Sequence, residues 1–437
     1  MEERELNRRG FLDREQYESA LDALVHPVHV PGGLGACPDE GEFAHAKDID
    51  YTADRVFTAI EGMPAGVDLS VGRVFSPVFD QGTRSTCLAS AVVSLMEYYH
   101  RMTASPAPPL SREFFHYRLM LPKVDAYRKF LEAPQKDEAF NRYYQDNYDS
   151  KLSQESNLRK SMASWREMYY SGSSIRRAYD VLKSEGICPE ELQPYVAVPH
   201  PDTGEHLLDI NPPEDLAALM AQPSWLAYSV KREESLQMLT GNSVDSYRRA
   251  LSGWSDDPLL SFTPMPVVFG LTLFQSCQSE YVLRTGWLSC PLPHGDEVFG
   301  GHALLAVGYR DTDLAPGGGY VIARNSWGEH FAWAYPAHHG YVRIPYAYIA
   351  HYAFPSAFTI RDDFSDVELE EDREWAPYMQ VAKQDMRDSR GGMTIPCDAA
   401  ILVDRNGLAE LDTLENRRRF KENNYKWEVN SRMEERL

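Results

Sequence analysis

Two short segments, far apart in the chain, contain the residue types that a thiol-dependent hydrolase needs. In the first, Gln81 and Gly82 stand shortly before Cys87. In the second, His302 follows two glycines, and Asn325 follows later within the run Asn-Ser-Trp-Gly. A thiolate attacks carbonyl carbons, an imidazole accepts and returns the proton, and an amide orients the imidazole. The four polar side chains together predict nucleophilic catalysis by the cysteine.

Cys87 is expected to begin a helix. Apolar side chains recur after it at helical spacing, as at Ala91 and Leu95. Ser85 or Thr86 is placed to cap that helix. A helix N-terminus and a neighbouring imidazolium both lower the pKa of a thiol. A lone cysteine is most often a structural thiol, but the accompanying residues favour a reactive one, so we expect Cys87 to be alkylated faster than the other cysteines near neutral pH.

The residues around the cysteine and the histidine have separate expected roles. Gln81 would donate its side-chain amide to the oxyanion, together with the backbone N–H of Cys87. Gly301, next to the histidine, leaves room for a substrate backbone, and Trp327 would cover the histidine–asparagine hydrogen bond from water. We therefore count Gly301 and Trp327 as substrate-binding candidates.

These segments resemble the papain family of cysteine peptidases. The resemblance lies in the spacing from Gln81 to Cys87, in Gly301-His302-Ala303, and in Asn325-Ser326-Trp327-Gly328. It covers residues from about 65 to 360 and is patchy between the motifs. It implies an α+β, papain-like two-lobe fold, with a helical left lobe that carries the cysteine and a β-barrel-like right lobe that carries the histidine and asparagine.

Some positions depart from the family pattern. Arg84 stands where the family usually has a disulfide-forming cysteine, which fits a reducing compartment and resembles bacterial intracellular members. Gly172 and Ser173 replace the family's disulfide-linked glycine loop beside the substrate, so both are further substrate-binding candidates. The cysteine and histidine lie further apart than the roughly 130–150 residues of the papain pattern, which indicates an insertion between them.

Composition narrows the class of protein. The formal net charge is -21, which argues against a nucleic-acid or anionic-membrane partner, because phosphate binding needs clustered Lys and Arg. No apolar stretch approaches the roughly 20 residues of a membrane span, and residues 1–6 lack the apolar run of a signal peptide. The six cysteines are scattered, without metal-binding spacing. We expect a cytoplasmic protein with no metal and no cofactor.

The chain divides into three expected parts. Residues 1–65 form an N-terminal extension, 66–361 the peptidase-like domain, and 362–437 an acidic C-terminal extension. Residues 119–170 are polar and helix-prone, and are the expected insertion within the domain. A helical half followed by a β-rich half is an α+β arrangement.

Hydrophobic periodicity predicts the individual elements. Helices are expected at 14–24, from 87 onward, at 175–185, around 213–254 and at 411–437. Strands are expected at 266–273, 303–309, 319–324 and 340–344.

These features predict a cysteine endopeptidase that hydrolyses protein or peptide substrates through a Cys87 thioester. Two alternatives keep the fold: a transpeptidase or isopeptidase that acts on a dedicated partner, and a binding module without catalysis. The complete set of four site residues argues against the binding module. We also expect the N-terminal extension, the insertion or the C-terminal extension to limit access to Cys87 until a regulatory partner or a cut displaces it.

Overall fold

The computed structural model describes most of the chain up to residue 361. The described residues are 6, 8–28, 33–51, 55–71, 75–102, 108–169, 172–197, 235–255, 262–334 and 338–361, with two short strands at 401–403 and 409–411. The acidic stretch after residue 361, the helix expected at 411–437 and the first part of the helix expected around 213–254 lie outside these residues, apart from the strand end at residue 411.

A curved seven-stranded sheet forms the β lobe, and its strand order is β4-β9-β5-β6-β7-β8, with β2 joined to β6. Its strands are β2 (Gly66–Asp68), β4 (Leu236–Thr240), β5 (Val267–Phe274), β6 (Val298–Asp311), β7 (Gly319–Arg324), β8 (Tyr341–Pro345) and β9 (Ala353–Ile360). Neighbouring strands pair antiparallel. The apolar run of β5 is buried along its whole length, so the core lies on both faces of the sheet.

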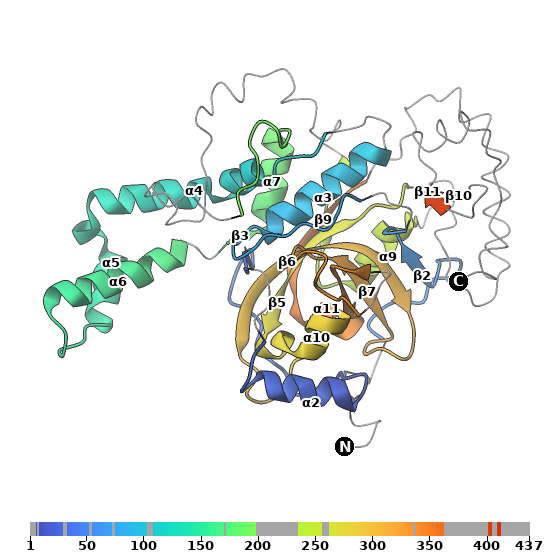
Figure 1. Cartoon of the computed structure of the whole chain (residues 1–437), viewed down its shortest axis with the longest axis horizontal. Coiled ribbons are helices and arrows are strands. Elements are labelled where there is room, and N and C mark those ends of the chain that lie inside the picture. The colour runs from blue at the N-terminus through green and yellow to red at the C-terminus, as the bar shows by residue number, and fades with distance from the viewer. Residues whose placement is uncertain are drawn as a thin grey trace.

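The helical lobe packs on one side of this sheet (Figure 1). It contains α3 (Cys87–Met102), the first part of α4 (Arg112–Glu132), and α7 (Ile175–Glu185). Small and apolar residues bury α3 along most of its length, which lets it lie directly on β6. Ser174 caps the start of α7, and Gly186 ends it at a φ of 70°.

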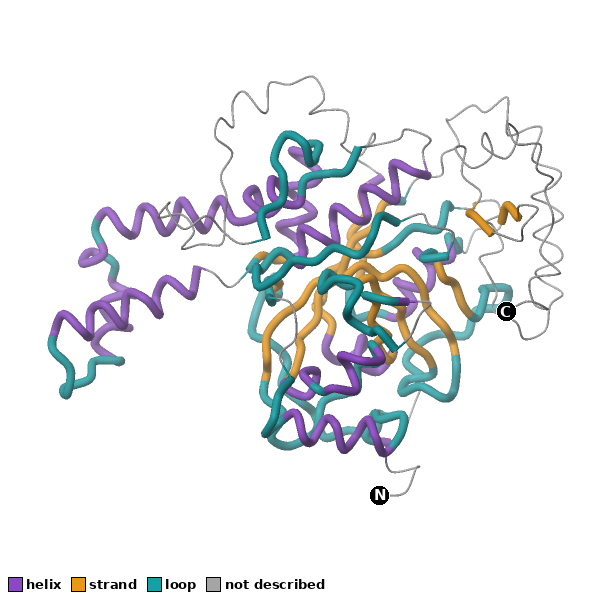
Figure 2. Tube along the Cα trace, in the orientation of Figure 1, coloured by secondary structure: helices purple, strands orange, loops and turns teal. Residues whose placement is uncertain are grey.

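A helical arm projects from the body of the molecule (Figure 2). It is built from the second part of α4, a short 3₁₀ turn, η1 (Pro134–Lys136), α5 (Glu138–Asp146) and α6 (Gln154–Tyr169). Its own small core is aromatic and includes Tyr127, Phe130, Phe140 and Trp165. The arm occupies the region where we expected an insertion.

The N-terminal part of the chain contacts both lobes. Helix α2 (Arg14–Ala23) packs on η5 (Gln275–Gln278) and α10 (Glu280–Thr285), at the end of the β lobe away from α3 (Figure 1). The chain then returns to the lobe boundary, where β1 (Ala36–Cys37) pairs in parallel with β3 (Ser173–Ser174). The N-terminal extension is therefore not a separate body.

The α+β prediction and most predicted elements are confirmed, including the helix that begins at Cys87 and the strands that became β5 to β8. The prediction of a helix around 213–254 is wrong for residues 236–240. These residues form β4, which pairs with β9. That error has a physical cause: β4 is stabilised by a partner far along the chain, which local periodicity does not show. Helices α9 (Val244–Ser252) and α11 (Tyr346–Tyr352) complete the lobe.

In the C-terminal extension, β10 (Ile401–Val403) pairs with β11 (Ala409–Leu411) of the same extension. Among the described helices, none combines the length and apolar character that crossing a bilayer requires.

Candidate active site

Cys87 is the first residue of α3 and is fully buried. Among backbone groups, those of Ala303 and Gly35 act most to lower the pKa of its thiol. Ala303 directly follows His302 in β6. The packing of α3 on β6 therefore brings the expected nucleophile to the residue next to the expected base.

The His302 ring is held on two sides. Its Nε2 lies 2.8 Å from Oδ1 of Asn325, and its ring stacks on Trp327 with centroids 4.8 Å apart. Asn325 Oδ1 also accepts the backbone N–H of Ser326 at 2.8 Å, which fixes it as an acceptor. Nε2 must then carry the hydrogen, so Nδ1 is the basic nitrogen.

The basic nitrogen of His302 is available. Nδ1 is buried and makes no hydrogen bond to any described group. A buried polar atom without a partner is uncommon and often marks a catalytic role. The Cys87 thiol, which is among the described groups, makes no hydrogen bond to Nδ1 in this closed form.

Strand pairing explains how the base and its orienting amide meet. His302 stands opposite Leu271 in the pairing of β6 with β5. Asn325 directly follows β7, on the other side of β6, and its N–H donates to the carbonyl of Gly340 at 3.0 Å. Both side chains are thus placed by a continuous ladder of backbone hydrogen bonds.

Gln81 connects the two lobes. Its backbone N–H donates to the carbonyl of Ser326 at 2.9 Å, and its Oε1 accepts the Ser326 hydroxyl. Its Nε2 donates to the carbonyl of Gly33 at 2.8 Å and to the carbonyl of Arg84. Both amide hydrogens are therefore in use, and an oxyanion can receive one only when the Gly33 carbonyl leaves.

Residues 33–37, here called the strap, pass through the site between the lobes. The strap donates from Gly33 N to the carbonyl of Gly82 at 3.1 Å. The carbonyl of Gly35, also in the strap, accepts a hydrogen bond from the backbone N–H of Ser173 at 3.0 Å. The strap is therefore hydrogen-bonded to the backbone N–H of Ser173, a residue that we expected to bind substrate.

Glycines allow this close approach. A Cβ on Gly172 would lie 2.1 Å from the carbonyl oxygen of Gly35, and one on Gly301 would lie 1.9 Å from that of Ala36. A Cβ on Gly35 itself would lie 2.0 Å from the carbonyl oxygen of Ser85. Any larger residue at these positions would force the backbones apart. Three substrate-binding candidates, Gly172, Ser173 and Gly301, thus contact the strap, whereas Trp327 covers the histidine as expected.

Burial dominates the electrostatics of the closed site. It raises the pKa of the Cys87 thiol to about 11, although backbone N–H groups act in the opposite direction. It lowers the pKa of His302 to about 4, against the hydrogen bond that the ring donates to Asn325. In this closed form burial thus outweighs the effects that were expected to lower the thiol pKa, because a buried thiolate loses its hydration.

The sequence did not identify the strap. Its signal was the run of glycines around Gly33 and Gly35, which indicated a loop. A glycine pattern shows that a backbone will come close, but the partner backbone is set by the fold.

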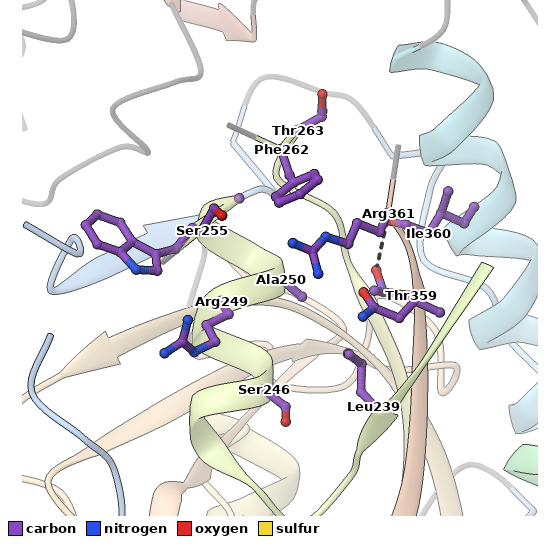
Figure 3. A pocket seen from close by; sticks show the side chains of 13 residues that line it. Leu239, Ser246, Arg249, Ala250, Ser255, Phe262, Thr263, Thr359, Ile360 and Arg361 are labelled. Carbon is purple, nitrogen blue, oxygen red and sulfur yellow. Dashed lines mark hydrogen bonds between the residues drawn. The ribbon is translucent and has the colours of Figure 1, made fainter. Parts of the chain in front are cut away.

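A separate pocket of about 400 Å³ lies among α9, β4 and β9 (Figure 3). Arg361 extends across it, with its guanidinium carbon 3.6 Å from the ring centroid of Phe262. None of the eight predicted site residues lines this pocket. Among the described residues, His, Cys, Asp and Glu form no group suited to a metal ion.

Comparison with known proteins gives a local match in sequence. No protein-family model matches the chain. Over 101 residues it is 35% identical to an uncharacterized peptidase C1-like protein of Acanthamoeba polyphaga mimivirus, a match that covers 23% of this chain and 29% of the viral protein. The chain thus spans less than a third of the length of this viral relative.

Solved papain-like structures overlap a larger share of the chain. Xylellain, a cysteine protease from Xylella fastidiosa, is 22% identical to this chain. The alignment covers 75% of this chain and 97% of xylellain, with a TM-score of 0.45. Bromelain from Ananas comosus, solved with the E64 inhibitor, is 16% identical, with coverage of 68% and 99% and a TM-score of 0.39.

Proposed function

We propose that this papain-like chain is a cysteine endopeptidase that hydrolyses peptide bonds through a thioester on Cys87. The observation that supports this function is the state of His302, whose Nε2 is fixed to Asn325 while the buried Nδ1 has no described partner. A ring held in this way can take a proton from a neighbouring thiol without reorienting.

The reaction has two balanced halves. The Cys87 proton moves to His302 Nδ1 as the sulfur bonds the substrate carbonyl carbon. The resulting oxyanion receives hydrogen bonds from the backbone N–H of Cys87 and from Gln81. The carbon–nitrogen bond then breaks, and His302 returns the proton to the leaving amine. In the second half, water gives a proton to His302, attacks the thioester and releases the acid and the thiol.

The strap keeps this enzyme closed in our proposal. It uses Ser173 N–H and the Gln81 amide, both of which a substrate would need. Burial of the thiol raises its pKa, against the Gly35 backbone, which lowers it. The N-terminal extension is thus the segment that limits access to Cys87, and its displacement by a partner or a cut would open the cleft.

The full chain with Gly35→Ala tests activity and closure together. The new Cβ would meet the carbonyl oxygen of Ser85 at 2.0 Å, so the strap should leave the cleft. Gly41→Ala is the control for backbone strain alone, because that Cβ would have no atom within 4 Å although the φ of 81° disfavours alanine. We expect Gly35→Ala to cleave an unbiased peptide library faster than the native chain and the Gly41→Ala chain. A folded Gly35→Ala chain that cleaves nothing would contradict the proposed activity.

The same acyl-enzyme would also serve a transpeptidase or isopeptidase. Adding an amine nucleophile to the library assay separates the reactions: hydrolysis gives free carboxylates, and transfer gives amide products. We propose hydrolysis in a reducing cytoplasm, a location that fits the five described cysteines, all of which are free thiols.

A further inference from the structure

The turn that joins Gln81 to Cys87 has to hold two oxyanion donors at a fixed separation. Thr83 in this turn is exposed, whereas the next residue, Arg84, is buried. Its side chain is only 1% exposed, an unusual place for a guanidinium. Since a turn on the surface has no need of a buried charge, the burial of Arg84 calls for a specific partner.

That partner is Glu113, whose side chain is fully buried. Nη2 of Arg84 donates to Oε1 of Glu113 at 2.8 Å, and Nη1 donates to Oε2, which makes a bidentate pair. Nη1 also donates to the carbonyl of Val196 at 2.7 Å, and Oε2 accepts the N–H of Val196 at 3.2 Å. The pair thus joins the turn, the first turn of α4 and the segment before residue 198.

Arg84 lies three residues after the oxyanion donor Gln81 and is bonded to it through its backbone. The carbonyl of Arg84 accepts the Gln81 side-chain amide, and the N–H of Arg84 donates to the Gln81 carbonyl at 3.3 Å. Any movement of the Arg84 backbone would therefore carry the Gln81 amide with it.

An aromatic ring supports the same turn. Tyr195 lies 5.2 Å from the Arg84 guanidinium and 3.8 Å from that of Arg112. Its hydroxyl donates to the Gln81 carbonyl at 2.8 Å and lies 3.0 Å from the Thr86 hydroxyl. The turn is thus fixed at both ends, at Gln81 and at the residue before the nucleophile.

We propose that the buried Arg84–Glu113 pair positions the Gln81 amide and the Cys87 backbone N–H for the oxyanion. This inference rests on the proposed function. Buried ion pairs contribute little net stability, since desolvation offsets their attraction, and apolar replacements of the whole pair are often neutral. A geometric role explains why this turn contains one.

The double variant Arg84→Met/Glu113→Gln tests the proposal in the full-length Gly35→Ala chain. It removes the ion pair and leaves the glutamine carbonyl to accept the Val196 N–H. We expect kcat to fall about 10- to 100-fold, less than the roughly 10²–10³-fold loss of a whole oxyanion donor, with little change in KM. The affinity for a peptide aldehyde, which forms an oxyanion on the thiol, should fall in parallel. The rate of Cys87 alkylation by iodoacetamide, which forms none, should not change.

The matched control is Arg118→Met/Glu185→Gln. That pair joins α4 to α7 in the same lobe, at 14% and 16% exposure, and contacts neither donor. It should leave kcat and aldehyde affinity unchanged. If the first double variant does not fold, Arg84→Lys alone serves, because lysine keeps the charge but loses the bidentate geometry; the same direction of change is expected.

Unchanged kcat and aldehyde affinity in a folded Arg84 variant would overturn the positioning role. Equal losses in the control pair would overturn it as well, since they would indicate a general effect on the lobe. An inactive Gly35→Ala parent would instead contradict the proposed function, so the two failures are distinguishable.

Discussion

The two halves of the site are held in place by different kinds of interaction. His302 and Asn325 lie on and beside sheet strands, where backbone ladders with β5 and β8 fix their positions. Gln81 lies in a turn that side chains stabilise, chiefly Arg84 through Glu113, and Tyr195. The strap contacts this turn through Gly33. The base is thus fixed by the fold, whereas the oxyanion donors depend on side-chain contacts and on the position of the strap.

The largest effect should come from removing the reacting groups, one from each half. Cys87→Ala and His302→Ala in the Gly35→Ala chain should each lower kcat by at least about 10³-fold, because proton transfer and acyl formation are lost. Steady-state hydrolysis of a library-derived peptide measures this. Cys277→Ala, which removes a buried thiol outside the site, is the control and should keep full activity. Near-normal turnover by His302→Ala would require a different base.

Gln81→Ala should come next. In the Gly35→Ala chain it removes one oxyanion donor, for which the usual loss is roughly 10²–10³-fold in kcat. In the native chain it also removes the hydrogen bond to the Gly33 carbonyl, so the strap should dock less tightly. Kinetics of both chains measure the two effects. A Gln81→Ala chain that keeps its kcat would show that the Cys87 N–H alone stabilises the oxyanion.

Asn325→Ala should be milder, because Asn325 orients the base and transfers no proton. The ring would keep its stacking on Trp327 and its backbone position. We expect a loss of about 10-fold to 100-fold in kcat, within the range of a general acid–base contribution. A loss as large as that of His302→Ala would mean that the sheet and Trp327 do not hold the ring.

The pH dependence of stability tests the closed site without measuring turnover. The pKa of His302 is about 4 in the closed fold, whereas an unperturbed histidine, as in the unfolded chain, has a pKa of 6.5. Between these values the unfolded chain binds a proton that the folded chain does not, so the free energy of unfolding falls as the pH drops from 6.5 towards 4. The contribution is on the order of 3 kcal/mol. Denaturant unfolding of the native chain and of His302→Gln across this range should show a weaker pH dependence for the variant.

The half of the site on the sheet was also the more predictable one. Local patterns indicated β5 to β8 and the residues that follow them, because the apolar runs and their turns are continuous in sequence. Arg84 and Glu113 gave no such signal, since a buried pair between a turn and a helix depends on contacts between distant residues. The strap and the β4–β9 pairing were missed for the same reason.

The alkylation rate of Cys87 tests the central claim most directly, because it depends on both the nucleophile and the strap. Brief iodoacetamide treatment at neutral pH, followed by peptide mapping of every cysteine, should label Cys87 far faster than the others in the Gly35→Ala chain. In the native and Gly41→Ala chains Cys87 should react slowly, because burial keeps its pKa at about 11. Uniform labelling of all cysteines in the Gly35→Ala chain, or no difference from the native chain, would contradict the account.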